Sequence, residues 1–188
     1  MRDLSLHLMD IVQNSIVAMS TRISISIAAY LESDELKIIV EDNGKGMDNE
    51  MLKKVTDPFV TTRDTRKVGL GISLFKASAE RSGGYLDITS EKGVGTTLEA
   101  VFKINNIDRP PLGDVADTIA GVLVSNESLH LALTLSRDDE MFSFDTEEVK
   151  KMLDGVPINE YEVLNWIKGY INEGINVTFG GVLNEINS

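Results

Sequence analysis

Two neighbouring segments in which apolar and small polar residues alternate strictly constrain the fold of this chain most. The alternation runs from Ile23 to Ile27, and it returns from Leu36 to Val40 after the polar stretch ESDE. A repeat of two residues is that of a β-strand with one buried face. The two segments therefore predict an antiparallel hairpin that covers one side of a hydrophobic core.

The elements around this hairpin predict a fold of two layers. Apolar residues at helical spacing predict a long helix over residues 3–19 and a second one from near Gly69 to the sequence SGG. Between these helices and after them, residues 49–55 predict a short helix, and YLDITS with TTLEAVFKI predicts a second hairpin. Helices that alternate with antiparallel strand pairs pack on one side of the sheet. The expected fold class is an α/β (α+β) two-layer sandwich with a mixed, mostly antiparallel sheet.

The sequence NNIDRPPLGD predicts a boundary, because two consecutive prolines continue neither a helix nor a strand ladder. Residues 1–107 are expected to form the two-layer domain, and residues 108–188 a small acidic α+β domain. In the second part we expect a helix over residues 115–123 and a hairpin of LHLALTLS and MFSF. Two more helices are expected, one with Asp145 as its cap and one that is capped by Asn159 and ends at Gly174.

Charge is distributed unevenly and excludes some partners. Residues 1–107 carry 13 Lys/Arg against 15 Asp/Glu, a net charge of −2, whereas residues 108–188 carry 5 against 15, a net charge of −10. A non-specific nucleic-acid binder needs clustered positive charge, so we expect no nucleic-acid partner. No apolar run approaches the about 18 residues that a membrane span requires, so no membrane partner is expected either. With no Cys the chain has no disulfide or thiolate site, and a cytoplasmic location is expected.

The stretch VEDNGKGM places an acidic turn with two glycines directly after the second predicted strand. The common nucleotide signatures are missing: the chain has no G-x-x-x-x-G-K-[ST], and neither GKGMDN nor GLGISL has the third Gly of a dinucleotide fingerprint. Four features remain in a set order, namely Asp10 with Asn14, Asp42 with Gly44 and Gly46, the helix start Gly69-Leu70-Gly71, and the turn from Gly93 to Thr97.

On these features the chain resembles the GHKL ATPases, the superfamily of gyrase, heat-shock chaperone, histidine kinase and MutL. The resemblance lies in the segments DIVQNS, EDNGKGM, DPFVTT, VGLGISL and GVGTTL, which follow one another within residues 3–104. Each segment alone is common in loops, and their order on the expected elements carries the assignment. The resemblance implies a histidine kinase-like ATP-binding domain with magnesium-ATP as its ligand.

The chemistry of adenine agrees with the second of these features. Adenine has a donor at its exocyclic amine and an acceptor at the adjacent ring nitrogen. A buried carboxylate such as Asp42 accepts from the amine, and the hydroxyl of Thr96 or Thr97 supports the base or an ordered water. Gly44 and Gly46 have no Cβ, so the backbone is expected to lie against the base and sugar. The next residue of the motif, Met47, is expected to line the same site.

Phosphate and magnesium are expected at the start of the second long helix. Amides at Gly69, Leu70 and Gly71 lie where the helix dipole favours phosphate. Asn14 offers a neutral oxygen to a magnesium ion that the triphosphate and water mainly hold. The basic segment before the helix is expected to close over the nucleotide as a lid. Its expected ligands are Thr61, Thr62 and Lys67, although the two threonines have the alternative role of shaping the loop.

Asp10 is the expected catalytic residue. It lies one turn before Asn14 on the same helix face, so both side chains point at the same space. In the gyrase, MutL and anti-sigma-factor-kinase branches an acid at this position acts as general base, and the resemblance gives Asp10 that role. Those branches usually have Glu, which is one methylene longer. The alternative role of Asp10 is therefore to support the magnesium shell through water.

Two functions of different classes follow from this resemblance. The first is a Mg-ATP-dependent ATPase or serine/threonine protein kinase of anti-sigma-factor type, with the acidic domain docking a protein target. The second is a nucleotide-gated protein-binding switch with little or no turnover. A free-standing histidine kinase is not expected, because the ATP-binding motifs begin at residue 10 and leave no room before them for a dimerising helix pair. The sequence does not identify the protein partner or the role of residues 108–188, and it leaves a homodimer open.

Overall fold

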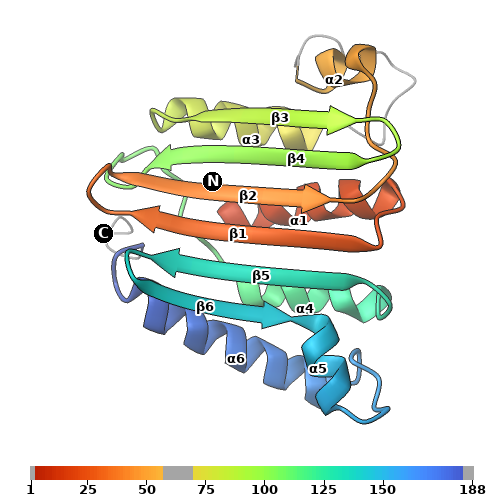
Figure 1. Cartoon of the computed structure of the whole chain (residues 1–188). Coiled ribbons are helices and arrows are strands. Elements are labelled where there is room, and N and C mark those ends of the chain that lie inside the picture. The colour runs from red at the N-terminus through yellow and green to blue at the C-terminus, as the bar shows by residue number, and fades with distance from the viewer. Residues whose placement is uncertain (1–2, 57–69, 184–188) are drawn as a thin grey trace.

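The fold is one mixed sheet with helices on one side, in a computed structural model that describes residues 3–56 and 70–183 (Figure 1). The elements in chain order are α1 (Leu4–Val17), β1 (Arg22–Tyr30), β2 (Glu35–Asp42), α2 (Asn49–Thr56), α3 (Leu70–Arg81), β3 (Tyr85–Glu91), β4 (Gly95–Lys103), α4 (Val115–Ser125), β5 (His130–Arg137), β6 (Glu140–Asp145), α5 (Thr146–Met152) and α6 (Tyr161–Phe179).

The six strands lie in the order β3-β4-β2-β1-β5-β6. The neighbours β1 and β5 are parallel, and every other neighbouring pair is antiparallel. Helices α1, α3, α4 and α6 all lie behind the sheet in Figure 1, so its other face has no helical cover among the described elements. The expected two-layer sandwich with a mixed, mostly antiparallel sheet is confirmed.

The hairpin that the alternating residues 23–27 and 36–40 predict forms as expected from β1 and β2. Ile25 of β1 pairs with Val40 of β2, and Ile27 pairs with Ile38. All four side chains are at most 2% exposed. Strand alternation turns each of them toward the helices, while the serines between the isoleucines face the uncovered side.

The residues after 107 belong to the same sheet. Strand β5 pairs with β1 over Arg22 to Ala29, and one hydrophobic core joins residues from both parts of the chain. The connection is buried rather than loose: Arg109 is 2% exposed and donates to the carbonyls of Ile104, Pro110 and Leu183. Burial lowers the pKa of this guanidinium. The sheet therefore continues across the expected boundary between residues 107 and 108, and the division of the chain into two domains at that point stays a prediction.

The last helix differs from its expectation at both ends. The prediction of Asn159 as its cap is wrong, because α6 begins at Tyr161 after Glu160, and the Asn159 amide donates to the carbonyl of Val124 instead. Gly174 does not end the helix, which continues to Phe179. A Cβ at Gly174 would lie 2.5 Å from the ring of Phe142, so this glycine allows strand β6 to pack closely on α6. None of the helices in the described part of the chain is long and apolar enough to span a membrane.

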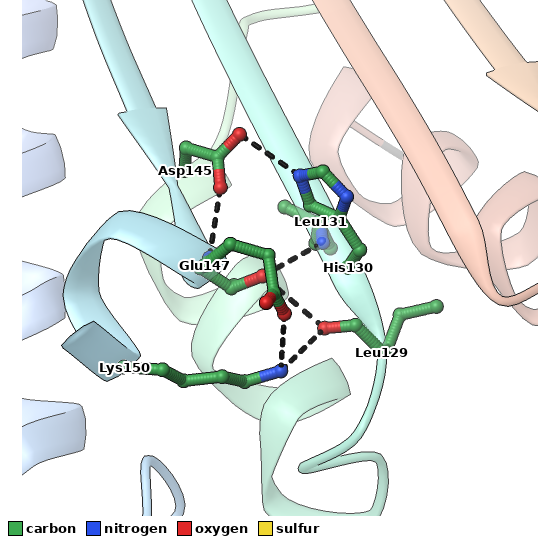
Figure 2. Close-up of polar contacts among 7 residues, drawn as sticks. Leu129, His130, Leu131, Asp145, Glu147 and Lys150 are labelled. Carbon is green, nitrogen blue, oxygen red and sulfur yellow. Dashed lines mark hydrogen bonds and ion pairs between the residues drawn. The ribbon is translucent and has the colours of Figure 1, made fainter.

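Asp145 connects the last strand to the helix that follows it (Figure 2). One carboxylate oxygen accepts from the backbone N–H of Glu147 at 2.8 Å, which caps α5, and the other lies 2.9 Å from Nε2 of His130. The cap at Asp145 is thus confirmed. Burial opposes ionisation of this carboxyl, but the hydrogen bonds from His130 and the Glu147 amide outweigh it and lower its pKa.

We expect Asp145→Ala to lower the free energy of unfolding by about 1 to 2 kcal/mol, because it removes a helix cap and the partner of His130. Because the folded pKa lies below the ordinary value of 3.8, this contribution is present above about pH 4 and is lost as the pH falls through the folded pKa. Urea unfolding at pH 7 and pH 3 measures both effects. The control is Asp139→Ala in the exposed turn before β6, and an equal loss in both variants would contradict the assignment.

Candidate functional site

An apolar cavity lies between α1 and the ends of β2 and β4, with α2 and α3 at its sides. Its volume is about 70 Å³, and it opens into a space that reaches about 650 Å³ when the solvent at its mouth is included. Polar groups enter it from Asn14, Ser15, Asp42, Lys45 and Thr96. The apolar lining comes from Ile11, Val17, Ala18, Val40, Met47, Met51, Val55, Ile72, Ile88 and Leu98. A mostly apolar pocket with a few convergent polar groups is the usual form of a small-molecule site.

Asp42 is the acid of this cavity, and three donors hold its carboxylate. Oδ2 accepts from the hydroxyl of Ser15 at 2.6 Å. Oδ1 accepts from the hydroxyl of Ser20 at 3.1 Å and from the backbone N–H of Gly44 at 2.8 Å. A carboxylate offers about four acceptor positions, so one position remains for a ligand. The neighbours fix the carboxylate in place without using its full capacity.

The turn after β2 is attached to the end of α1 by its own side chains and backbone. Asn43 accepts from the backbone N–H groups of Thr21 and Arg22 at 2.9 and 2.8 Å. The N–H of Lys45 donates to the carbonyl of Ala18 at 2.9 Å. These bonds bring Asp42 to the C-terminal end of α1, where Ser15 and Ser20 reach it.

Gly44 and Gly46 of this turn pack closely against other parts of the protein, which the sequence did not indicate. A Cβ at Gly44 would lie 2.6 Å from the hydroxyl of Ser20 and 2.8 Å from the carbonyl of Ala18. Gly46 has a φ of +60°, and a Cβ there would overlap the carbonyl of Glu91. The close packing of both glycines against the protein accounts for the missing side chains, and the expected contact of this backbone with a base and sugar stays a prediction. Gly46 lines the cavity, whereas Gly44 is not part of its lining.

We expect Gly46→Ala to destabilise the protein by at least about 2 kcal/mol, because the new methyl group adds a clash with Glu91 to a left-handed backbone conformation. The control is Gly93→Ala, which has a similar positive φ of +82° but no neighbouring atom within 4 Å. Thermal unfolding of the two variants separates the clash from the backbone strain. Equal losses would contradict the close packing of this turn against the β3–β4 hairpin.

The two threonines of the second hairpin lie on opposite faces of the sheet. Thr96 lines the cavity and pairs across the sheet with Asp42, while its hydroxyl lies 2.9 Å from that of Ser90. Thr97 follows it in the strand, so its side chain points to the face without helices. Of the two threonines, Thr96 is therefore the one that lies at the cavity, and its expected role in binding the base stays a prediction.

Asn14 lies in the wall of the cavity, and Asp10 lies outside it, against α3. Asn14 is part of the lining. Asp10, one turn earlier, lies outside the lining and packs against the start of α3: a Cβ at Gly71 would lie 2.7 Å from the Cβ of Asp10 and 3.2 Å from its Oδ2. Gly71 is therefore needed for the close approach of α1 and α3. The carboxylate of Asp10 thus lies at the N-terminus of α3, and the side-chain amide of Asn14, one turn further along α1, lines the cavity.

Part of the expected site falls outside the described residues. Thr61, Thr62, Lys67 and Gly69 lie in the segment 57–69, so their expected roles as ligands stay predictions. Leu70 is the first residue of α3. Within residues 3–56 and 70–183, no group of three or more acidic or histidine side chains is arranged to hold a metal ion.

Three serines in the site were missed by the sequence reasoning. Ser15 and Ser20 hold Asp42, and Ser90 accepts from the N–H of Met47 at 2.8 Å. The signal was present, because Ser15 lies on the apolar face of its helix and Ser90 continues the inward series of Leu86 and Ile88. A polar residue at an inward position usually has a buried partner.

Comparison with known proteins gives a family match over more than half of the chain. Residues 2–106 match the family described as histidine kinase-, DNA gyrase B- and HSP90-like ATPases. The matched range contains every residue that lines the cavity.

Curated relatives match about half to two thirds of the chain. The signal transduction histidine-protein kinase AtoS of Escherichia coli (strain K12) is 35% identical over 99 residues, which cover 52% of this chain and 16% of AtoS. The sensor kinase CckA of Brucella abortus (strain 2308) is 30% identical over 122 residues, 64% of this chain and 12% of CckA. The chain thus spans less than a fifth of the length of these relatives.

A solved structure resembles nearly the whole chain. The N-terminal domain of a DNA repair protein superposes with a TM-score of 0.52 at 15% identity, over 96% of this chain and 58% of the other. At that identity the likeness concerns the fold alone. It extends over the residues after 107, which agrees with their place in the common sheet.

Proposed function

Because the chain belongs to the family of histidine kinase-, DNA gyrase B- and HSP90-like ATPases, we propose that it binds magnesium-ATP with the adenine base in the cavity described above. The observation that carries this proposal is the state of Asp42, which is held by three donors and keeps one acceptor position beside an apolar cavity. The exocyclic amine of adenine supplies the missing donor.

The walls of the cavity support a flat, apolar-faced ligand. Val40 and Leu98 belong to the sheet, and Met47 and Met51 face it from the turn and from α2. A base is larger than a cavity of about 70 Å³, so its binding requires side chains at the mouth to move. Methionine has an unbranched, flexible side chain that adapts to such changes at low cost. We expect Met47 and Met51 to change rotamer when the nucleotide enters.

The phosphates are proposed to extend toward the start of α3. A helix N-terminus favours phosphate through its free amides and its dipole. Asn14 would contribute one neutral oxygen to the magnesium ion, since this ion usually keeps water and phosphate as its other ligands. The absence of an acidic cluster among the described residues agrees with a metal held mainly by its nucleotide. Bound magnesium-ATP supplies the γ-phosphoryl group and the charge neutralisation for its transfer.

The proposed reaction is hydrolysis of ATP or phosphoryl transfer to a protein hydroxyl, with Asp10 as the base. Its carboxylate lies against the start of α3, beside the place proposed for the phosphates. From there Asp10 can orient water or a substrate hydroxyl and accept its proton. The close packing of α1 on Gly71 brings the shorter Asp side chain nearer to α3.

One observation favours the second candidate, a nucleotide-gated binding switch. Asp10 does not line the cavity, and its side chain packs on the backbone of Gly71. An acid fixed in that position would bridge the two helices when nucleotide binds, without transferring a proton. In this alternative, nucleotide binding changes the affinity for a protein partner.

Two measurements test the proposal in sequence. Calorimetric titration with magnesium-ATP is expected to give a dissociation constant between micromolar and millimolar, and no binding in that range would contradict it. Incubation with γ-labelled ATP and cell extract then separates the candidates, because label on a protein indicates a kinase and released phosphate an ATPase. The Asp42→Asn variant in the same extract is the control for other kinases. Binding without either product supports the switch.

A further inference from the structure

Helix α6 lies beside the edge strand β6 (Figure 1) and carries two exposed aromatic residues one turn apart, Trp166 and Tyr170. Trp166, the only tryptophan of the chain, stacks on Tyr170 with ring centres 5.3 Å apart and planes inclined by 7°. Trp166 is 49% exposed and Tyr170 is 39% exposed. The two rings thus form a flat aromatic surface that is about half open to solvent.

The packing beneath this surface fixes its geometry. The ring of Tyr170 contacts that of Phe142 with centres 5.0 Å apart. Phe142 comes from β6 and fills the space over Gly174, where a side chain would collide with it. The aromatic pair is therefore held by both a helix and a strand, and a ligand does not have to order it. Tyrosine and tryptophan with so little freedom are typical anchors of protein interfaces.

The charges around the pair are negative. Glu162 lies one turn before Trp166 and Glu173 lies three residues after Tyr170, so both carboxylates lie on the same helix face as the rings. Within the described residues neither has a cationic partner. The one basic residue of α6, Lys168, is engaged with Asp117 of α4 at 2.6 Å. A stacked aromatic pair between two carboxylates is suited to a cation over the ring face.

We propose that the Trp166–Tyr170 surface binds an arginine-rich segment of a partner protein, with a guanidinium group over the rings and Glu162 and Glu173 as its counter-charges. Arginine fits better than lysine, because its planar group stacks on aromatic faces and is more weakly hydrated. Charge complementarity supports this partner, since residues 108–188 have a net charge of −10. A second copy of the chain is disfavoured by its own net charge of −12.

The experiment measures binding of a fluorescently labelled hexa-arginine peptide to the full chain by anisotropy, without nucleotide. Trp166→Ala and Tyr170→Ala are each expected to weaken binding by about fivefold to thirtyfold. Tyr161→Ala is the matched control, because Tyr161 is a 73% exposed aromatic residue on a different face of the same helix, and it is expected to leave the affinity unchanged. Equal affinity in all three variants would overturn the proposal.

A second comparison separates specific counter-charges from the overall negative field. Glu162→Gln with Glu173→Gln is expected to weaken the peptide more than Glu32→Gln with Glu91→Gln, a change of equal charge at exposed sites elsewhere. Equal effects of the two double variants would overturn the role of the counter-charges. A hexa-lysine peptide is expected to bind more weakly. Sedimentation of the free protein tests the other occupant, and a dimer that Trp166→Ala dissolves would overturn the proposal.

Discussion

Asp42→Asn is expected to remove measurable binding of magnesium-ATP. The substitution replaces the carboxylate, which only accepts hydrogen bonds, with a neutral amide. Either the NH2 group of this amide opposes the exocyclic amine of adenine, donor against donor, or its uncharged oxygen accepts from the amine more weakly. Loss of a charge-assisted hydrogen bond, together with an unpaired buried donor, costs on the order of 3 to 5 kcal/mol, which corresponds to a loss of about 10² to 10⁴ in affinity. Calorimetric titration at pH 7 measures the effect.

Two controls show whether this loss comes from the carboxylate itself. Ser15→Ala removes one donor to Asp42 but keeps its charge, so we expect a loss of tenfold or less, on the order of 1 kcal/mol. Inosine triphosphate, which carries an oxygen in place of the exocyclic amine, is expected to bind the unaltered protein poorly. An Asp42→Asn variant that is folded and binds ATP with unchanged affinity would remove adenine from this site.

Asp10→Asn is expected to keep ATP binding and to lose turnover by about 10² to 10⁴-fold. Asparagine has nearly the same shape as aspartate, so the packing of α1 against Gly71 is preserved. It cannot accept a proton, and only the chemical step should suffer. Single-turnover release of labelled phosphate, at nucleotide concentrations that saturate the binding curve, measures that step.

The length of the acid gives a matched control for this prediction. Asp10→Glu restores the residue that is usual at this position in the branches that the chain resembles, and it is expected to keep turnover. Gly71→Ala pushes on the Asp10 side chain and is expected to reduce turnover with a smaller effect on binding. If Asp10→Asn turns over ATP at the unaltered rate, Asp10 has a structural role and the switch becomes the better account.

Much of the fold could be predicted because it follows from periodicity. The alternation in residues 23–27 and 36–40 fixed the first hairpin, and the observed pairing of Ile25 with Val40 places both on the helical side. What periodicity could not predict is the pairing between distant strands. Nothing local to residues 129–136 indicates that β5 runs parallel to β1 and extends the same sheet.

The ends of elements were harder to predict, because tertiary contacts decide them. Asn159 followed by Glu162 has the pattern of a capping box. In the structure, however, the side-chain amide of Asn159 donates a hydrogen bond to the carbonyl of Val124 at the end of α4. Glycine often ends a helix, but Gly174 lies within α6, where its missing side chain leaves space for the ring of Phe142. Both errors come from a neighbour that is distant in sequence.

The candidate site was likewise predictable in its residue types but not in its contacts. Residue types identified Asp42, Asn14, Gly46, Met47 and Thr96, which the structure brings to one cavity. The sequence could not predict why Gly44 and Gly46 lack a side chain, since a close approach to a ligand and a close approach to the protein demand the same missing Cβ. Only coordinates distinguish the two, and here the neighbours are Ala18, Ser20 and Glu91.

A crystal structure with magnesium and a non-hydrolysable ATP analogue tests the central claim most directly. We predict that the base enters the cavity beneath Met47, with its exocyclic amine within hydrogen-bond distance of the Asp42 carboxylate and its phosphates toward the start of α3. A bound analogue whose base lies outside that cavity, with Asp42 still occupied only by Ser15, Ser20 and Gly44, would contradict the account.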